Sequence, residues 1–387
     1  MKRHRPTPTA LTTHRFDDEA MQRMAAKAPS WARQPDLHYP SRLALEQCSG
    51  EAAARYKARL AAHLIPPTHR RSMADLTGGL GVDFSRMAPL FATAHYVERN
   101  PDLCQAAAHN FPLLGLQSAT ITCGEAAEVM ESLPPQTLIY LDPARRDALG
   151  RKTVHIEDCT PNVADLLPRL REKAEWVMVK LSPMLDISLA LRSLAGAVQR
   201  VDIVGAGGEC KELLLTIGPQ TAEAVAADNP LIVVGEGEEG PAFSFRPSEE
   251  REAQAPLSDS LPPGHYLYEP SPAMLKSGCF KLMAQRFGLH KLADATHLYT
   301  SPQRLDHFPG RCMEITAVSG FDKAALSRLR TTTERANLTL RNFPGTTDSL
   351  RKKLRLKDGG TLYLFATTMA DGSHRLIHTR HPERPAT

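Results

Sequence analysis

The 387-residue chain carries 47 lysines and arginines against 43 aspartates and glutamates, a formal net charge of +4. Its hydrophobic content of 42% and charged content of 23% are typical of a soluble globular protein. No run of about 18 apolar residues occurs, which excludes a membrane-spanning helix, and the basic N-terminus lacks the apolar segment of a signal peptide. The seven cysteines are scattered singly, without the spacing of a zinc site or a disulfide framework. We expect a cytoplasmic protein of two or three domains that holds no metal.

Residues 1–68 are predicted to be mostly helical. Apolar residues recur at helical spacing until Pro66 and Pro67, which end the pattern, and Ser41 can cap a helix that continues toward Gln47. We favour a helical lid or brace on the domain that follows. The alternative is a contact with nucleic acid through basic residues of these helices, namely Arg42, Arg55, Lys57 and Arg59.

Residues 69–220 alternate between strands and helices throughout. This alternation predicts a doubly wound α/β domain with a mostly parallel sheet, closed by two strands whose short connection allows them to be antiparallel. Residues 221–265 change character and predict a hairpin extension followed by a polar, proline-bearing linker. Residues 266–387 contain shorter helices and strands, which predict one or two small α+β domains.

The most informative stretch is Met73-Ala-Asp-Leu-Thr-Gly-Gly-Leu-Gly-Val-Asp83. An apolar strand there runs into a glycine-rich turn and then into a helix, which places backbone N–H groups at the carboxyl edge of a parallel sheet. Glycine suits this turn because a Cβ would block a positive φ or the close approach of a ligand. The next strand ends in Glu98, whose carboxylate can accept hydrogen bonds from ribose hydroxyls. Together these features predict a site for a nucleotide-like ligand.

Two classes of ligand fit such a site, a dinucleotide and S-adenosylmethionine (SAM). The order G-G-x-G departs from the dinucleotide fingerprint G-x-G-x-x-G. Asp75 lies inside the motif, where it could meet a cationic amino-acid tail, and a later apolar strand ends in Asp142-Pro143. An acidic loop, an acid on the second strand and Asp-Pro on the fourth resemble the class I SAM-dependent methyltransferases.

Other segments widen this resemblance: Tyr39-Pro40, Tyr56-Lys57-Ala58, Leu141-Asp-Pro-Ala-Arg-Arg-Asp147, Lys180-Leu-Ser-Pro-Met-Leu-Asp186, Glu209-Cys-Lys-Glu212, Tyr268-Glu-Pro-Ser-Pro272 and Arg341-Asn-Phe343. With the glycine motif they are similar to a family of bacterial SAM-dependent methyltransferases. The resemblance implies an N-terminal helical region and a Rossmann-like class I sheet. It also implies a ferredoxin-like domain at 266–312 and a THUMP-like domain at 313–387. Because THUMP domains bind RNA in other enzymes, structured RNA such as tRNA or rRNA is the implied partner.

The resemblance also implies roles for individual residues. Those implied to bind SAM are Asp75, Thr77, Gly78, Gly79, Gly81, Glu98, Glu125 and Asp142. Those implied to be catalytic are Asp142, Pro143, Arg145 and Lys180. In this scheme the carboxylate of Asp142 accepts a hydrogen bond from an exocyclic amine of the target base.

A second pattern at the same strand is the Asp-Pro-Pro-Arg of 5-methyluridine methyltransferases. Those enzymes need a nucleophilic cysteine after the next strand, and here that place reads Lys180-Leu-Ser182-Pro183. A covalent pyrimidine mechanism is therefore not expected. An amine acceptor is favoured, although the second proline of the amine-methyltransferase motif is replaced by Ala144, and Arg145 stands where those enzymes have the aromatic residue that stacks on the base.

Basic residues crowd the predicted mouth of the site. These residues are Arg145, Arg146, Arg151, Lys152 and Lys180. One interpretation is that they bind a phosphate-bearing substrate. The other is that they form ion pairs with the nearby acids Asp147, Glu157, Asp158 and Asp186. The run 351–357 is a further candidate for RNA contact, or else an ordinary solvated face. We predict a SAM-dependent methyltransferase for a base in RNA. The alternatives are a methyltransferase for a protein or small molecule, and a non-catalytic RNA-binding protein with a relic SAM fold.

Overall fold

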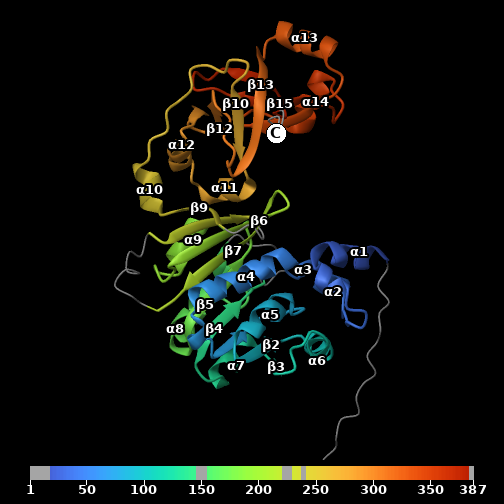
Figure 1. Cartoon of the computed structure of the whole chain (residues 1–387), viewed down its shortest axis with the longest axis vertical. Helices are drawn as coiled ribbons and strands as arrows, with labels where there is room; N and C mark the ends of the chain where they lie inside the picture. The colour runs from blue at the N-terminus through green and yellow to red at the C-terminus, as the bar shows by residue number, and fades with distance from the viewer. Residues whose placement is uncertain (1–17, 145–154, 220–228, 237–240, 383–387) are drawn as a thin grey trace, which may run out of the picture. The chain divides into compact units, whose positions relative to one another are not determined.

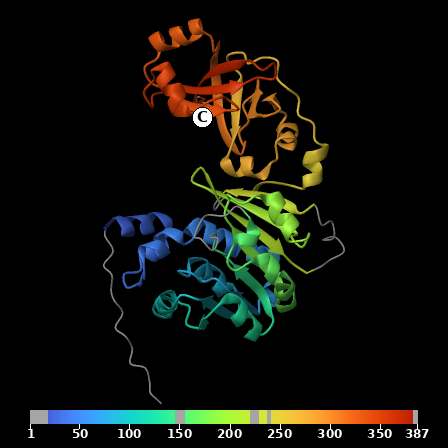
Figure 2. The same ribbon diagram turned by 180° about the vertical axis from the view of Figure 1, so that it is seen from behind.

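The computed structural model describes residues 18–144, 155–219, 229–236 and 241–382. The chain divides into two compact units (Figures 1 and 2). The first comprises 1–206, 211–230 and 236–240, and the second comprises 207–210, 231–235 and 241–387. In the described ranges, no helix is long and apolar enough to cross a membrane. The same ranges contain no group of three or more His, Cys, Asp or Glu side chains that could hold a metal ion.

The N-terminal two-thirds of the chain is a mixed α/β structure. Its helices are α1 (Asp18–Lys27), α2 (Pro29–Ala32), α3 (Arg42–Gln47), α4 (Glu51–Leu64), α5 (Val82–Met87), α6 (Pro101–Leu113), α7 (Ala126–Ser132), α8 (Val163–Lys173) and α9 (Ile187–Ser193). Its strands are β1 (Ser72–Asp75), β2 (Thr93–Glu98), β3 (Ala119–Cys123), β4 (Gln136–Leu141), β5 (Ala174–Leu181), β6 (Arg200–Ala206), β7 (Glu209–Ile217), β8 (Leu231–Glu236) and β9 (Pro241–Phe245).

These strands form one sheet in the order β3-β2-β1-β4-β5-β7-β6-β8-β9. Strands β1 to β5 pair in parallel, so the predicted doubly wound, mostly parallel sheet is confirmed. The two closing strands are neighbours in the sheet, and β7 runs antiparallel to β5. The strand order reverses between β1 and β4. In open α/β sheets, ligands bind at the carboxyl ends of the strands beside such a switch point.

The N-terminal helices share the core of this sheet. Figures 1 and 2 show α4 (blue) against α5 and the sheet. From α4, Tyr56 and Leu60 are buried in one apolar cluster with Phe84, Tyr96 and Phe111. The last three rings pack with centroids 5.1–5.6 Å apart. The helix is thus an integral part of the core, as the predicted brace requires.

Local capping explains where the short helix α3 begins. The Ser41 hydroxyl accepts a hydrogen bond from the backbone N–H of Ala44 at 3.1 Å, which satisfies one of the free donors of the first turn. The predicted cap at Ser41 and the helix toward Gln47 are confirmed.

The C-terminal part is a second α/β structure. Its helices are α10 (Pro247–Glu252), α11 (Pro272–Ser277), α12 (Lys281–Phe287), α13 (Lys323–Thr332) and α14 (Thr347–Leu354). Its strands are β10 (Tyr266–Pro270), β11 (His290–Ala293), β12 (Thr296–Ser301), β13 (Gly310–Gly320), β14 (Asn337–Arg341), β15 (Tyr363–Thr368) and β16 (His374–Arg380). They form a seven-stranded sheet in the order β11-β12-β10-β13-β16-β15-β14, and the predicted hairpin at Asp371-Gly372 joins β15 to β16.

This second sheet curls around an apolar interior. Its inner cluster draws side chains from six strands, among them Leu267, Leu298, Met313 and Phe365. The curl brings the two ends of the sheet together, since Asn342, which follows β14, donates a hydrogen bond to the hydroxyl of Thr296 in β12 at 3.0 Å. Helices α13 and α14 cover the outer face through a separate leucine cluster.

The segment predicted as a linker is structured where α10 forms. The carboxylate of Glu250 accepts the backbone N–H groups of Lys281 and Leu282, at 2.8 Å each, and so caps α12. Glu249 pairs with Arg286 at 2.5 Å. These partners lie more than 30 residues away in sequence. The polar, proline-bearing composition of the segment therefore gave no sign of them.

Candidate functional site

The carboxyl edge of the sheet gathers the acidic residues that the sequence singled out. Asp75 ends β1, Glu98 ends β2 and Asp142 follows β4 directly. Asp75 lies between Tyr96 of β2 and Tyr140 of β4 in the parallel register. Asp75 and Asp142 therefore flank the switch point between β1 and β4.

The glycine loop is packed too tightly for side chains. A Cβ on Gly78 would lie 2.1 Å from the Tyr96 ring, and one on Gly81 would lie 2.8 Å from the Phe111 ring. Gly81 also has a φ of 91°, which strains other residues. The N–H of Gly79 donates to the carboxylate of Glu98 at 2.9 Å, so the loop and the end of β2 are directly linked.

Asp75 is almost completely buried, with 1% of its surface exposed. Its carboxylate accepts the backbone N–H of Thr77 at 3.0 Å. Burial raises the pKa of Asp75 well above its usual range, although the bond from Thr77 opposes this shift. A cationic group brought to this carboxylate would favour its ionised form.

Thr77 joins the glycine loop to the strand that carries Asp142. The backbone N–H of Asp142 donates to the Thr77 hydroxyl at 2.6 Å. The buried Pro143 follows, so the chain leaves β4 with a restricted backbone. Glu125, at the start of α7 after β3, is exposed at the same edge. Arg145 lies outside the described residues.

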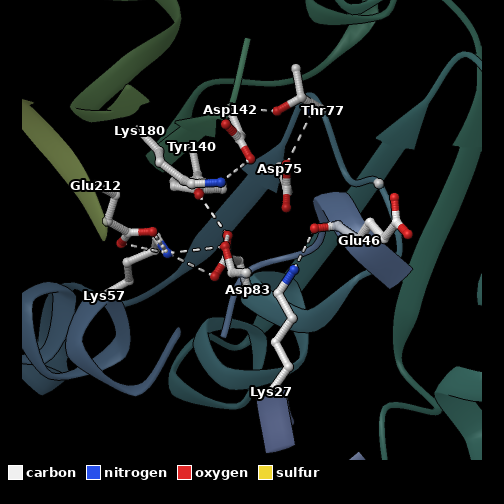
Figure 3. A network of polar contacts seen from close by, with 12 residues as sticks. Lys27, Glu46, Lys57, Asp75, Thr77, Asp83, Tyr140, Asp142, Lys180 and Glu212 are labelled. Atoms are coloured by element: carbon white, nitrogen blue, oxygen red, sulfur yellow. Dashed lines mark hydrogen bonds and ion pairs between the residues drawn. The ribbon is translucent and has the colours of Figure 1, made fainter. Parts of the chain in front are cut away.

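Lys180 is the partner of Asp142. Its ammonium lies 2.5 Å from the Asp142 carboxylate, at the end of β5 (Figure 3). Burial disfavours its charge, yet the carboxylates of Asp142, Glu212 and Asp83 raise the pKa of Lys180 above its usual value. Of the five basic residues predicted at the mouth, Lys180 alone is described. Lys180 pairs with Asp142 of the site itself. The sequence had suggested a substrate phosphate or other nearby acids as its partners.

A buried ionic network lies beneath the loop. Lys57 of α4, with a fully buried side chain, contacts Asp83 at 2.9 Å and Glu212 of β7 at 2.7 Å (Figure 3). Asp83 also accepts hydrogen bonds from Ser49 at 2.6 Å and Tyr140 at 2.8 Å. Burial alone would raise the pKa of Asp83, but the charges of Lys57 and Lys180 hold this pKa below its usual value. The pKa of Glu212 is raised, because burial outweighs the same two charges.

The sequence suggested that Glu212 could line this edge, but it gave Lys57 and Asp83 no role in the site. The signal was present, because Lys57, Asp83 and Glu212 each belong to a segment that carries the family resemblance. The alternative role of Lys57 in nucleic-acid contact is wrong, since its ammonium is buried and paired. Arg42 and Arg55 pair with Glu46 and Glu51 on their own helices.

The N-terminal helices also bring a second lysine toward the site. Lys27, at the end of α1, donates to the backbone carbonyls of Leu45 and Glu46 at 3.2 and 2.6 Å (Figure 3). Burial lowers the pKa of Lys27, and the nearby charges of Lys180 and Lys211 add to this effect. The helical region thus contributes charge to the site as well as apolar packing.

A cleft of about 550 Å³ opens at the opposite edge of the sheet. It is lined by the residues at which β1, β4 and β5 begin, including Ser72, Gln136 and Ala174. The site residues lie at the carboxyl ends of the same strands. The cleft is therefore not part of this site.

Comparison with known proteins fits this geometry. A family model described as a ferredoxin-like domain matches residues 266–309, and one described as THUMP domain-like matches residues 310–381. The crystal structure of a proposed methyltransferase from Porphyromonas gingivalis W83 is 36% identical and superposes with a TM-score of 0.84. That match covers 94% of this chain and 89% of the other. The chain belongs to this methyltransferase family.

Other solved structures resemble only part of this methyltransferase. A SAM-dependent methyltransferase from Agrobacterium tumefaciens is 17% identical over 45% of this chain and 63% of the other, with a TM-score of 0.35. A proposed RNA methyltransferase from Pyrococcus horikoshii is 19% identical over 39% and 70%, with a TM-score of 0.30. No curated protein sequence matches the chain.

The predicted fold class is confirmed. The methyltransferase combines a Rossmann-like sheet with ferredoxin-like and THUMP-like domains, as the sequence motifs implied. The roles of individual residues remain predictions.

Proposed function

We propose that the protein is a SAM-dependent methyltransferase that modifies a base of structured RNA, at an exocyclic amine. The observation that carries this proposal is the placement of Asp142. Its backbone is bonded to Thr77 of the glycine loop, and its carboxylate is held by Lys180 at the switch point of the sheet. A carboxylate beside a nucleotide-type loop is suited to positioning an acceptor amine.

The residues present fit SAM as the cofactor. Gly78 and Gly81 let the loop pack against the Tyr96 and Phe111 rings, which fixes the loop backbone beside Asp75 and Glu98. The buried Asp75 would hold the cationic amino group, and Glu98 would hold the ribose hydroxyls. Glu125, exposed after β3, would contact the adenine end. An anionic set of this kind suits a cationic ligand better than a pyrophosphate.

SAM supplies an electrophilic methyl group that is transferred by in-line displacement, so the protein mainly positions the acceptor. Lys180 keeps Asp142 oriented with one carboxylate oxygen engaged. The other oxygen can accept a hydrogen bond from the amine, which turns the nitrogen lone pair toward the methyl group. Pro143 would supply its backbone carbonyl as a second acceptor for the same amine.

The C-terminal unit supports RNA as the substrate. Its residues 310–381 are THUMP domain-like. The basic run on and after α14 is partly neutralised, because Arg351 pairs with Asp358 and Lys357 pairs with Glu334. Lys352 and Lys353 are exposed, and the ammonium of Lys353 lies 4.4 Å from the centre of the Phe321 ring. An exposed lysine pair beside an aromatic ring suits a nucleic-acid surface.

The experiment that tests the cofactor is calorimetric titration of the full-length protein with SAM. We expect saturable binding that weakens at least tenfold in Asp75→Ala and Glu98→Ala. Glu175→Ala is the matched control, because Glu175 is an exposed carboxylate at the opposite edge, paired with Arg71. Absence of SAM binding by the wild type, with RNA present or absent, would contradict the proposal and favour a non-catalytic RNA-binding protein.

A further inference from the structure

Two arginines meet one buried carboxylate at an end of the curled second sheet. Glu269, near the end of β10, is 4% exposed. It lies two residues after Leu267, whose side chain belongs to the inner cluster, so Glu269 is on the same inward face of β10. Arg311 and Arg341 come from the start of β13 and the end of β14. We call these two residues the arginine pair.

Both arginines bind Glu269 directly. Arg311 donates through Nε to Oε2 at 2.6 Å and through Nη2 to the same oxygen. Arg341 Nη2 lies 2.7 Å from Oε1. The guanidinium of Arg311 also lies over the Phe365 ring, 5.5 Å from its centre, which fixes its plane. The pair is therefore held rigidly, as a binding site requires.

One arginine would neutralise Glu269, and two leave a net charge of +1 at this place. The side chains remain 46% and 40% exposed, so the surplus charge faces solvent. Arg311 bonds Glu269 through Nε and Nη2, and its Nη1 takes no part in these bonds. Nε of Arg341 is buried and has no hydrogen-bond partner within the described part of the chain. A phosphate cannot reach this buried atom, so binding would use the exposed remainder of the two guanidinium groups.

We propose that the arginine pair is a phosphate-binding site, positioned by Glu269, that holds a backbone phosphate of the RNA substrate. The planar fork of guanidinium matches phosphate oxygens, and a prearranged pair loses little side-chain freedom on binding. The site joins the ferredoxin-like segment, which supplies Glu269, to the THUMP-like segment, which supplies both arginines. This inference rests on the proposed RNA substrate, and it adds the residues that hold the substrate.

The test is RNA binding by the full-length protein, measured by fluorescence anisotropy with a labelled RNA hairpin at several salt concentrations. In Arg311→Gln and Arg341→Gln we expect affinity to fall about three- to tenfold at low salt. The slope of log K against log[salt] should become shallower by about 0.7–0.9 for each phosphate that the variant no longer neutralises. Arg311→Lys keeps the charge and should recover most of the slope.

Arg380→Gln is the matched control, because Arg380 is exposed to a similar degree and forms an ion pair with Glu314 on the same sheet. Unchanged affinity and slope in both arginine-pair variants, with RNA binding by the wild type intact, would overturn the site and leave the proposed function standing. SAM binding without any RNA binding by the wild type would overturn both the site and the RNA substrate.

A second measurement keeps the inference testable if a glutamine variant fails to fold. The wild-type protein is treated with phenylglyoxal, which modifies arginine, and the modified residues are mapped by mass spectrometry with and without RNA. RNA should protect Arg311 and Arg341 but not Arg380. Equal modification of the three residues in both samples would overturn the site.

Discussion

The ammonium of Lys57 lies 2.9 Å from the carboxylate of Asp83, although one residue belongs to an N-terminal helix and the other to the helix after the glycine loop. The same ammonium reaches Glu212, on the antiparallel strand that closes the parallel part of the sheet. Lys57 therefore connects three elements beneath the loop. We infer that the N-terminal helices help to fix the shape of the site.

Replacing Lys57 with methionine tests this connection. The variant leaves Asp83 and Glu212 buried without their cation, so we expect the free energy of unfolding in urea to fall by about 3–5 kcal/mol. Arg59→Met on the same helix is the control. Its exposed side chain predicts a change of about 0.5 kcal/mol or less. A loss below about 1 kcal/mol in Lys57→Met would show that the network contributes little to stability.

Asp75→Asn should make the protein more stable and a poorer binder of SAM. The pKa of Asp75 is raised in the folded state, so the unfolded chain loses this proton more readily and stability falls as pH rises above about 3.9. Asparagine removes this cost and keeps an oxygen for the Thr77 N–H. We expect a gain of about 0.5–2 kcal/mol at neutral pH.

Denaturation at several pH values measures that gain. The extra stability of Asp75→Asn over the wild type should disappear near pH 3, where Asp75 of the wild type is protonated in both the folded and the unfolded state. Calorimetry on the same samples should show SAM binding at least tenfold weaker. A variant that is both less stable and unchanged in SAM binding would contradict the role given to Asp75.

Gly78→Ala isolates the steric argument for the loop. Its φ lies outside the left-handed region, so the expected damage comes from the contact of the new Cβ with the Tyr96 ring. Overpacking of this severity should cost about 3 kcal/mol or more. Gly50→Ala is the control, because its Cβ would meet its nearest neighbour at an ordinary 3.6 Å. Similar unfolding curves for the two variants would refute the close packing.

Lys180→Met should separate cofactor binding from methyl transfer. It leaves the Asp142 carboxylate without the ion pair that orients it, so we expect the transfer rate to fall about 10²-fold or more. SAM affinity should change less than tenfold, and Lys180→Arg should recover part of the rate. Because the pKa of Lys180 is raised, its charge persists through moderately alkaline pH and the wild-type rate should not fall there through its titration. An unchanged rate in Lys180→Met would remove Lys180 from the site.

The sequence predicted those parts of the site whose pattern is local. A strand followed by Gly78, Gly79 and Gly81 predicts a tight turn into a helix, and acids that end parallel strands must meet at one edge. Asp75, Glu98 and Asp142 were placed correctly at that edge for this reason.

The ion pairs escaped prediction because they join residues that are far apart. Lys57 and Glu212 are separated by 155 positions, and Lys180 and Asp142 by 38. A basic side chain near a site can bind a substrate phosphate or a carboxylate of its own chain, and only the folded structure distinguishes the two. The same limit hid α10, whose helix is stabilised by contacts with α12.

Methyl transfer from SAM to RNA can be measured by incubating the protein with methyl-labelled SAM and total RNA from cells that lack this protein. We predict that wild-type protein transfers label to RNA, that digestion places the label on a base, and that Asp142→Ala, which removes the acceptor oxygen, lowers the rate about 10²-fold or more while still binding SAM. Label that enters protein or small molecules while the RNA stays unlabelled would show that RNA is not the substrate.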